Sequence, residues 1–261
     1  MLTDYGTTDE FVGVLHAVVA RDAPGAPVVD LSHHVASFDV TAGARALVRC
    51  WPHLGPGVVV AVVDPGVGTQ RRAVAVAVAG DGPNMLVGPD NGLLGGALAL
   101  AGGAVDAVEL PRPEGAPVTF DGRDVFAPAG ARLWAGAPLR SLGAAIDPAT
   151  LATLPPPRCR VGTATLDAEV LWVDRFGNVQ LAATAADGAA AGLSGEVEVR
   201  VADKTMPARR VDTFGELAPG ELGLLVDGNG HLAVACNREA AATVLGVTAG
   251  DDVAVTAGRA P

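Results

Sequence analysis

Residues 58–73 read VVVAVVDPGVGTQRRA, an apolar run that stops at Asp64 and is followed by a glycine-rich turn and two arginines. The run of mostly β-branched residues predicts a strand that is buried on both faces. Pro65, Gly66 and Gly68 then predict a stiff turn. A plain surface hairpin would need less constraint, so the stretch indicates a core strand whose end holds a carboxylate with little freedom.

On both sides of this stretch, strand-like and helix-like patterns alternate. The expected strands cover 26–31, 58–64, 73–79, 84–90 and 104–110, and the expected helices cover 7–22, 38–51, 91–102 and 122–136. The chain begins MLTDYG, so either the first strand is very short or translation starts further upstream. This alternation predicts an α/β layered domain with a largely parallel sheet.

The alternation of strand and helix patterns stops at LATLPPPRCR, residues 151–160. Three consecutive prolines cannot continue a helix or a central strand, so this segment is the expected linker. Short strands separated by Gly, Asn and Asp turns follow it and predict a small all-β sandwich or barrel. The expected organisation is an α/β domain over 1–150, a proline-rich linker over 151–160 and an all-β, barrel-like domain over 161–261.

Composition restricts the class of protein. The chain has 261 residues, of which 49% are hydrophobic, so it can bury a sizeable core. A net charge of −11 disfavours binding to nucleic acid. We find no apolar run of about 18 residues for a membrane span and no secretory signal. The three cysteines lie far apart, which suits a reducing compartment. We expect a cytoplasmic protein with neither a membrane nor a nucleic-acid partner.

Four polar turns fall where the strands of such a sheet would end. They are LTDYGTTD (2–9), VDPGVGTQRR (63–72), VGPDNGLL (87–94) and TFDGRD (119–124), which offer the carboxylates of Asp4, Asp64, Asp90 and Asp121. Ligands of open α/β sheets bind beyond the carboxyl ends of the strands. If these ends converge, they form an acidic crevice that suits a cation or ribose hydroxyls. For Asp90 alone, a structural turn is the favoured interpretation.

Other chemistries find little support. The five histidines are scattered without metal-ligand spacing, so no metal is expected, and His33 and His34 are interpreted as strand-end or surface residues. No G-x-S-x-G, P-loop or G-x-G-x-x-G motif occurs, which disfavours acyl transfer, phosphoryl transfer and dinucleotide chemistry.

In this order, LTDYGTTDEFVG, VVDPGVGTQRRA, VGPDNGLL, TFDGRDVFAPAGARL and DRFGN resemble the S-adenosyl-L-methionine (SAM) hydroxide adenosyltransferase family. These SAM hydrolases are related to the fluorinase and the chlorinase, and the similarity runs from residue 2 to about residue 240. The resemblance implies a homotrimer, with SAM held between the first domain of one subunit and the second domain of its neighbour. It also implies SN2 attack of water or hydroxide at C5′ of SAM, which gives adenosine and methionine. SAM is then the substrate, and no cofactor is needed.

Within this resemblance, Asp64 is the carboxylate that helps to deprotonate the water, and Arg71 is its partner. The halogenases carry Tyr and Thr where this chain has Asp64 and Val67, so water is the expected nucleophile. A carboxylate would repel a halide by about 4 kcal/mol at a distance of about 4 Å and an effective dielectric of about 20. The hydrolases have His where this chain has Asp121. Either Asp121 substitutes for that His, or it only caps the turn and Asp64 works alone.

The resemblance also assigns substrate contacts in the first domain. Asp4 corresponds to an Asp that holds the ribose hydroxyls, and Phe38 corresponds to a halogenase Trp that flanks the ribose. Thr119 and Phe120 would line the C5′ pocket, where Gly122 leaves room for the nucleophile. The neighbouring Arg123 and Asp124 are interpreted as an ion pair or a helix start.

In the second domain, Asp174 and Asn178 would bind the methionine amine and the adenine edge. Phe214 would stack on adenine or, equally, belong to the core. Gly228 and Asn229 stand where the family often has Ser or Ser-Arg for the methionine carboxylate.

Two other functions stay open. A SAM- or adenosine-binding protein with weak or lost catalysis is favoured by the missing His, the sparse first strand and the absent Ser-Arg. A SAM-dependent halogenase is disfavoured by Asp64 and Val67.

Overall fold

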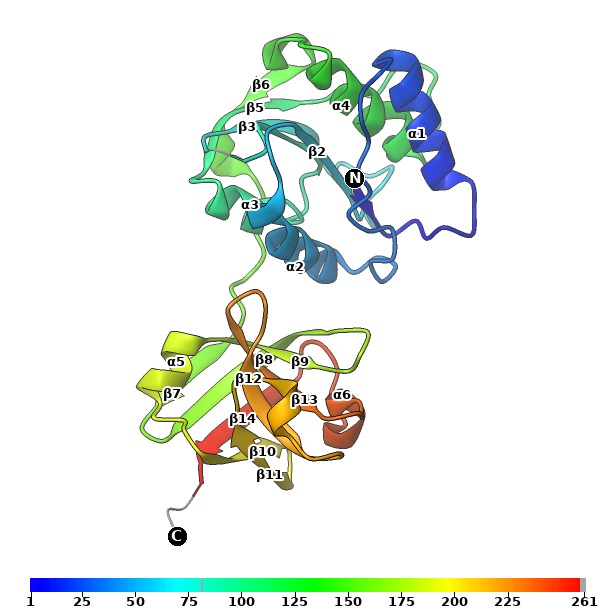
Figure 1. Ribbon diagram of the computed structural model, residues 1–261. Coiled ribbons are helices and arrows are strands. Elements are labelled where there is room, and N and C mark those ends of the chain that lie inside the picture. Colours follow the sequence, from blue (N-terminus) through cyan, green and yellow to red (C-terminus); the bar gives the residue numbers. More distant parts are fainter. Residues whose placement is uncertain (81, 259–261) are drawn as a thin grey trace. The chain divides into compact units, whose positions relative to one another are not determined.

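The computed structural model describes residues 1–80 and 82–258, and the chain forms two compact units (Figure 1). The first unit is Met1–Leu154, and the second begins at Pro155. The division therefore falls inside the proline-rich segment 151–160. Each unit has a hydrophobic core of its own.

The first unit is built on a six-stranded sheet with the strand order β1-β2-β4-β3-β5-β6. Its strands are β1 (Leu2–Thr3), β2 (Val58–Val62), β3 (Ala73–Val78), β4 (Met85–Pro89), β5 (Ala104–Glu109) and β6 (Ala144–Ile146). β1, β2 and β4 are parallel, whereas β3 is antiparallel to both β4 and β5, and β6 is antiparallel to β5. The α/β layers are confirmed, but the sheet is mixed rather than largely parallel. The connection from β3 to β4 is too short for the crossover that a parallel pair needs.

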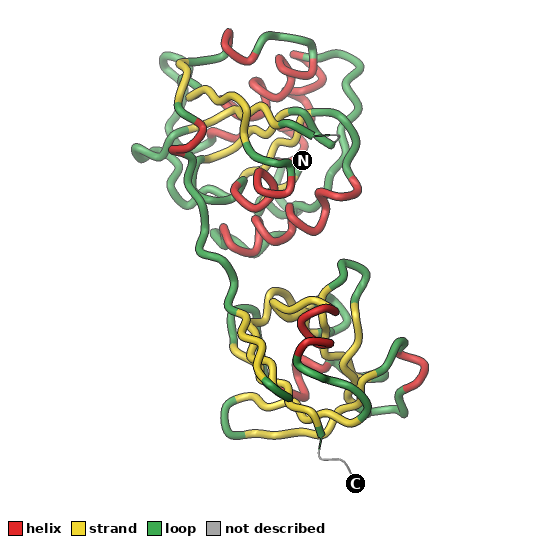
Figure 2. Tube along the Cα trace, turned by 90° about the vertical axis from the view of Figure 1, so that its left-hand side faces the viewer, coloured by secondary structure: helices red, strands yellow, loops and turns green. Residues whose placement is uncertain are grey.

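Helices cover both faces of this sheet, as Figure 2 shows. They are α1 (Phe11–Asp22), α2 (Val40–Cys50), α3 (Gly95–Leu100) and α4 (Ala127–Trp134), with short 3-10 turns at Trp51–His53, Leu139–Ser141 and Pro148–Thr150. α1 packs on α4, and α2 packs on α3. Along β2 the side chains alternate: Ala61 faces the core under α2 and α3, and Val60 and Val62 face the core under α4. This explains why the whole run is apolar.

Several elements differ from expectation, among them α3, which begins at Gly95 rather than at residue 91. α1 begins at Phe11 rather than at residue 7. The segment 26–31 is not a strand, and the one isolated bridge to β1 nearby, from Leu2 to Ser32, falls just after it. The helix expected over 122–136 opens with a π-helical turn, Gly122–Phe126, before α4. In the described part of the chain, no helix is long and apolar enough to cross a membrane.

The second unit is a closed β-barrel, as the sequence predicted. Its elements are β7 (Cys159–Gly162), β8 (Thr165–Val173), β9 (Val179–Thr184), α5 (Ala185–Ala190), β10 (Glu196–Val201), β11 (Lys204–Arg210), a 3-10 turn (Phe214–Glu216), β12 (Leu222–Val226), β13 (His231–Cys236), α6 (Ala241–Leu245) and β14 (Asp252–Ala257). The order β14-β10-β11-β12-β13-β9-β8 closes through pairing of β14 with β8. Leu181, Leu224 and Val255 are among the fully buried residues at its centre.

Candidate active site

A tight turn follows β2 and carries Asp64. The carbonyl oxygen of Gly66 accepts hydrogen bonds from the amide of Thr69 at 3.1 Å and from its hydroxyl at 2.6 Å. Gly68 has φ of 79°, and a Cβ there would lie 2.8 Å from the carbonyl oxygen of Val118. Only glycine therefore satisfies both the backbone conformation and the close approach, and the turn holds its carboxylate rigidly.

Arg71 binds the Asp64 carboxylate with two parallel hydrogen bonds. Its Nε donates to Oδ1 at 3.0 Å, and its Nη2 donates to Oδ2 at 2.5 Å. Both side chains are buried, with 6% of Asp64 and 8% of Arg71 exposed. Burial raises the pKa of Asp64 above its ordinary value, although Arg71 opposes the shift. The site thus contains a carboxylate that is more basic than usual and fixed in direction.

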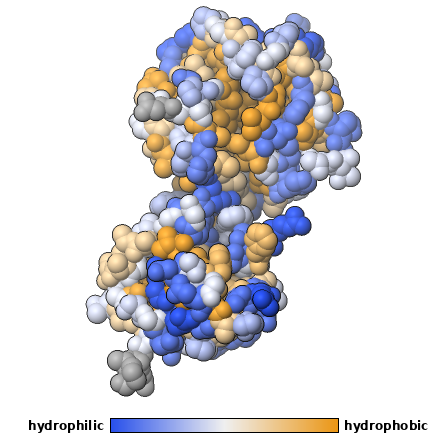
Figure 3. Space-filling model, viewed as in Figure 1, coloured by the Kyte–Doolittle hydropathy of each residue, from blue (hydrophilic) through white to orange (hydrophobic). Residues whose placement is uncertain are grey.

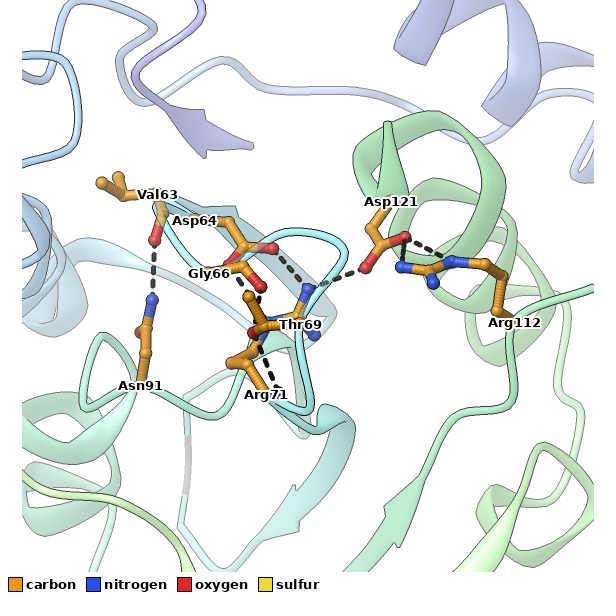
Figure 4. A network of polar contacts seen from close by, with 8 residues as sticks. All are labelled: Val63, Asp64, Gly66, Thr69, Arg71, Asn91, Arg112 and Asp121. Atoms are coloured by element: carbon orange, nitrogen blue, oxygen red, sulfur yellow. Dashed lines mark hydrogen bonds and ion pairs between the residues drawn. The ribbon is translucent and has the colours of Figure 1, made fainter. Parts of the chain in front are cut away.

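Asp121 lies on the other side of Arg71, although it is far away in sequence (Figure 4). Its Oδ2 accepts from Arg71 Nη2 at 2.7 Å, and its Oδ1 accepts from Arg112 Nε at 3.0 Å and Nη2 at 2.6 Å. The side chain of Asp121 is 3% exposed. Asp64, Arg71, Asp121 and Arg112 therefore form a chain of alternating charge with no net charge.

This network corrects two expectations. Asp121 stands at the N-cap position of the π-helical turn, but its side chain makes no capping hydrogen bond. The idea that it only caps the turn is wrong. The network itself is also not acidic, because Arg71 and Arg112 balance the carboxylates of Asp64 and Asp121. Asp90 pairs instead with Arg72 and accepts from the amide of Ala152 at 2.7 Å, which is a structural role.

Tyr5 is a site residue that sequence reasoning missed. Its ring packs edge-on against Phe11 and Phe120. A Cβ on Gly122 would overlap the Tyr5 hydroxyl, so the space that Gly122 leaves is taken by Tyr5. Burial raises the pKa of Tyr5, and the nearby carboxylates of Asp4 and Asp64 add to the shift. The phenol therefore stays protonated beside the two carboxylates.

The remaining predicted residues of the first unit lie nearer the surface. Asp4 Oδ2 accepts from the amide of Phe38 at 2.9 Å. Phe38 has φ of 68°, in the left-handed region, and its side chain is 72% exposed. Thr119 is exposed. Arg123 and Asp124 form the expected ion pair at 2.7 Å.

Hydrophobic residues gather on the face of this unit seen in Figure 3.

The second unit has a separate pocket of about 410 Å³ that gathers the residues predicted there. Its lining includes Asp174, Asn178, Phe214 and Asn229. Asp174 accepts from the backbone amide of Asn178 at 2.9 Å and from its side-chain amide at 2.8 Å. Phe214 is 50% exposed, so its interpretation as a core residue is wrong.

Asp227, which the sequence did not single out, also lines this pocket. It accepts from Gln180 Nε2 at 2.5 Å and from the amide of Asn229 at 2.8 Å, and so orders the loop at the pocket edge.

The fold and the buried carboxylate–guanidinium site agree with one family of proteins. The family model for the SAM hydroxide adenosyltransferase N-terminal domain matches residues 1–143, and the model for its C-terminal domain matches residues 168–254. The chain belongs to the SAM hydroxide adenosyltransferase family.

Particular relatives cover almost the whole chain. An (R)-S-adenosyl-L-methionine hydrolase of Salinispora tropica is 52% identical over 98% of this chain and 96% of its own length. A hydrolase of the same name from Thermus thermophilus is 43% identical over 95% of both chains. A fluorinase of an Actinoplanes species is 27% identical over 98% of this chain and 96% of its own.

Among solved structures, an uncharacterized conserved protein of Thermotoga maritima superposes with a TM-score of 0.89 at 32% identity and covers 98% of both chains.

Proposed function

We propose that this protein hydrolyses SAM to adenosine and L-methionine. Relatives that carry the name SAM hydrolase align with nearly its whole length. The observation that carries the proposal is the Asp64–Arg71 pair, a buried carboxylate fixed by two hydrogen bonds. Its chemistry suits the activation of a water molecule.

In the proposed reaction, water attacks C5′ in line with the C5′–S bond. The C5′–O bond forms as the C5′–S bond breaks, and methionine leaves as a neutral thioether. The water loses one proton to Asp64. The sulfonium is already a good leaving group, so we propose that no acid, metal or cofactor takes part. Placement and desolvation of the water supply the catalysis.

Two opposing effects on the pKa of Asp64 suit the role of a general base. Burial raises its pKa, which makes the carboxylate a better proton acceptor than an exposed aspartate. Arg71 opposes the shift and favours the ionised form that a base needs.

We further propose that Asp121 does the work of the family His by holding Arg71. Asp121 lies between two guanidinium groups, those of Arg71 and Arg112, whereas Asp64 accepts from Arg71 alone among the described side chains; Asp64 is therefore the proposed acceptor for the proton. Arg112 would then be a positioning residue, because it contacts Asp121 rather than Asp64.

Substrate contacts are proposed for both units. Asp4, Phe38, Thr119 and Phe120 would receive the ribose and C5′, and Asp174, Asn178, Phe214 and Asn229 would receive the adenine and methionine parts. As in the resemblance, the first unit of one subunit would meet the second unit of its neighbour in a homotrimer. The protein would act in the cytoplasm.

The test is chromatography of the products after pure protein has been incubated with SAM, with and without high chloride. Adenosine and methionine should appear in both samples. Asp64→Asn should lower the rate by about 10²–10⁴-fold, the usual contribution of a general base. Asp124→Asn is the matched control, since that carboxylate lies in the π-helical turn after Asp121 and pairs with Arg123 rather than with Arg71.

Each other outcome identifies an alternative. An Asp64→Asn variant with the wild-type rate would refute the mechanism. Formation of 5′-chloro-5′-deoxyadenosine in the chloride sample would indicate a halogenase. Bound nucleoside without any product would indicate a binding protein that has lost catalysis.

A further inference from the structure

Away from the Asp64 network, three potential metal ligands meet at one point. His16 projects from α1, and Asp30 and His33 lie in the segment between α1 and α2. Asp30 Oδ1 is 3.0 Å from His16 Nε2 and 2.9 Å from His33 Nε2. One ligand atom from each of the three residues lies within 4.8 Å of the others. Among the described residues, this is the one such group of His, Cys, Asp and Glu.

His33 supplies the observation that points to a ligand. Its side chain is only 4% exposed, and its Nε2 makes no hydrogen bond of acceptable geometry despite the short distance to Asp30. A buried polar atom without a hydrogen bond needs another partner, and a cation shared with Asp30 Oδ1, which also contacts His16 Nε2, would provide one.

The other ring nitrogen of His33, Nδ1, has a buried hydrogen-bond partner. His33 Nδ1 lies 2.8 Å from the hydroxyl of Thr3, which is itself fully buried. Metal-binding histidines usually have such a partner on the second nitrogen, because it fixes the ring orientation and the tautomer. Thr3 thus directs Nε2 of His33 toward Asp30 and His16.

We propose that His16, Asp30 and His33 bind a divalent transition-metal ion of the zinc class. Two imidazoles and one carboxylate are a donor set typical of Zn²⁺ and its neighbours in the first transition series, and are a poor set for Mg²⁺ or Ca²⁺. His16 and Asp30 are 39% and 36% exposed, so an ion can enter and water can complete its coordination. The ion takes no part in the proposed hydrolysis.

Such an ion would connect α1 to the segment that runs beside β1. The amide of Leu31 donates to the carbonyl of Met1 at 2.7 Å, and the amide of Gly6 donates to the carbonyl of His33 at 2.7 Å. Metal binding should therefore stabilise the first unit, whatever the protein catalyses.

The test uses untagged, full-length protein that has been stripped with a chelator. Calorimetric titration with Zn²⁺ should give one ion per chain, and Zn²⁺ should raise the midpoint of thermal unfolding. Mg²⁺ should do neither. His16→Gln and Asp30→Asn, both at half-exposed positions, should each weaken Zn²⁺ affinity by at least about 10-fold. His34→Gln is the matched control, because His34 is exposed and lies outside the cluster.

Thr3→Val tests the support behind His33. It should weaken Zn²⁺ binding by about 10–100-fold, and Thr3→Ser should restore the affinity. Absence of Zn²⁺ binding to the wild-type protein would overturn the proposal. Equal affinity in wild type, His16→Gln and Asp30→Asn would also overturn it, since the ion would then be held elsewhere.

Discussion

Replacement of Arg112 by methionine tests whether the charge network in the first unit acts as a whole. The substitution keeps most of the aliphatic side chain but removes the two hydrogen bonds to Asp121 Oδ1, at 3.0 and 2.6 Å. Asp121 then has Arg71 as its remaining described cation, and Arg71 is already shared with Asp64. Two buried carboxylates would share one guanidinium.

The size of the effect follows from burial. Hydrogen bonds to charged groups contribute about 1.5–3 kcal/mol, and removal of one partner of a fully buried ion pair costs about 3–5 kcal/mol. Arg112 is 29% exposed, so water can partly replace it, and the lower range applies. We expect Arg112→Met to lower the free energy of unfolding by about 2 kcal/mol. In a unit of this size each kcal/mol shifts the unfolding midpoint by about 2–4 °C, so the shift should be about 4–8 °C.

Thermal unfolding of the full chain, followed by calorimetry, measures this shift. The matched control is Arg123→Met, which removes the partner of Asp124 from the nearby π-helical turn, where Arg123 is 36% exposed, and should move the midpoint far less. Addition of Asp121→Asn to Arg112→Met should recover part of the loss, because no underpaired carboxylate is left. Equal shifts for Arg112→Met and Arg123→Met would refute the idea of a network.

Further predictions concern the site. Because burial raises the pKa of Asp64, kcat/KM should fall on the acid side with a midpoint above the ordinary aspartate value of 3.8, measured as a pH–rate profile; a midpoint below 3.8 would contradict the assignment. Folding stability should depend on pH in the opposite direction to activity. The contribution of Asp64 to the free energy of unfolding is fully present below its unfolded-state pKa and is lost as pH rises through its folded-state pKa. Gly122→Ala should destabilise the protein by about 1–3 kcal/mol in denaturant unfolding; because the new Cβ meets the Tyr5 hydroxyl, Tyr5→Phe should recover part of this, and no recovery would mean that the clash lies elsewhere. Phe214→Ala should raise KM for SAM by about 2–10-fold in steady-state kinetics, the range of an aromatic contact, and an unchanged KM would exclude stacking.

Much of the fold could be predicted because the local patterns agree with it. The apolar run that ends at Asp64 predicted a strand covered on both faces. The prolines of 151–160 predicted where the first domain gives way to the second. The direction of β3 was predictable but missed, because only residues 80–83 separate the expected strands 73–79 and 84–90, which is too short for the crossover that a parallel pair needs. The segment 26–31 has the composition of a strand, but the isolated bridge to β1 forms only at Ser32, just after it.

The resemblance to a known family, rather than any local pattern, predicted the centre of the site. It assigned Asp64 and Arg71, which lie on one short, glycine-rich stretch, and Asp121, which lies on another turn. Arg112 and Tyr5 reach the site through tertiary packing, and no local pattern marks either of them. The group of His16, Asp30 and His33 was missed for the same reason, because α1 brings His16 to a segment that follows it in the chain.

Closure of the barrel through its first long strand and its last one has a consequence for biosynthesis. Thr165 of β8 pairs with Thr256 of β14, so the ring cannot close until β14 has been made. Until then the edges of β8 and β10 that β14 will cover remain open to other chains. The sheet of the first unit has no such delay, because all its strands are complete before β7 is translated. Nascent chains are therefore most exposed to misassembly during synthesis of the second unit, after the first can already have folded.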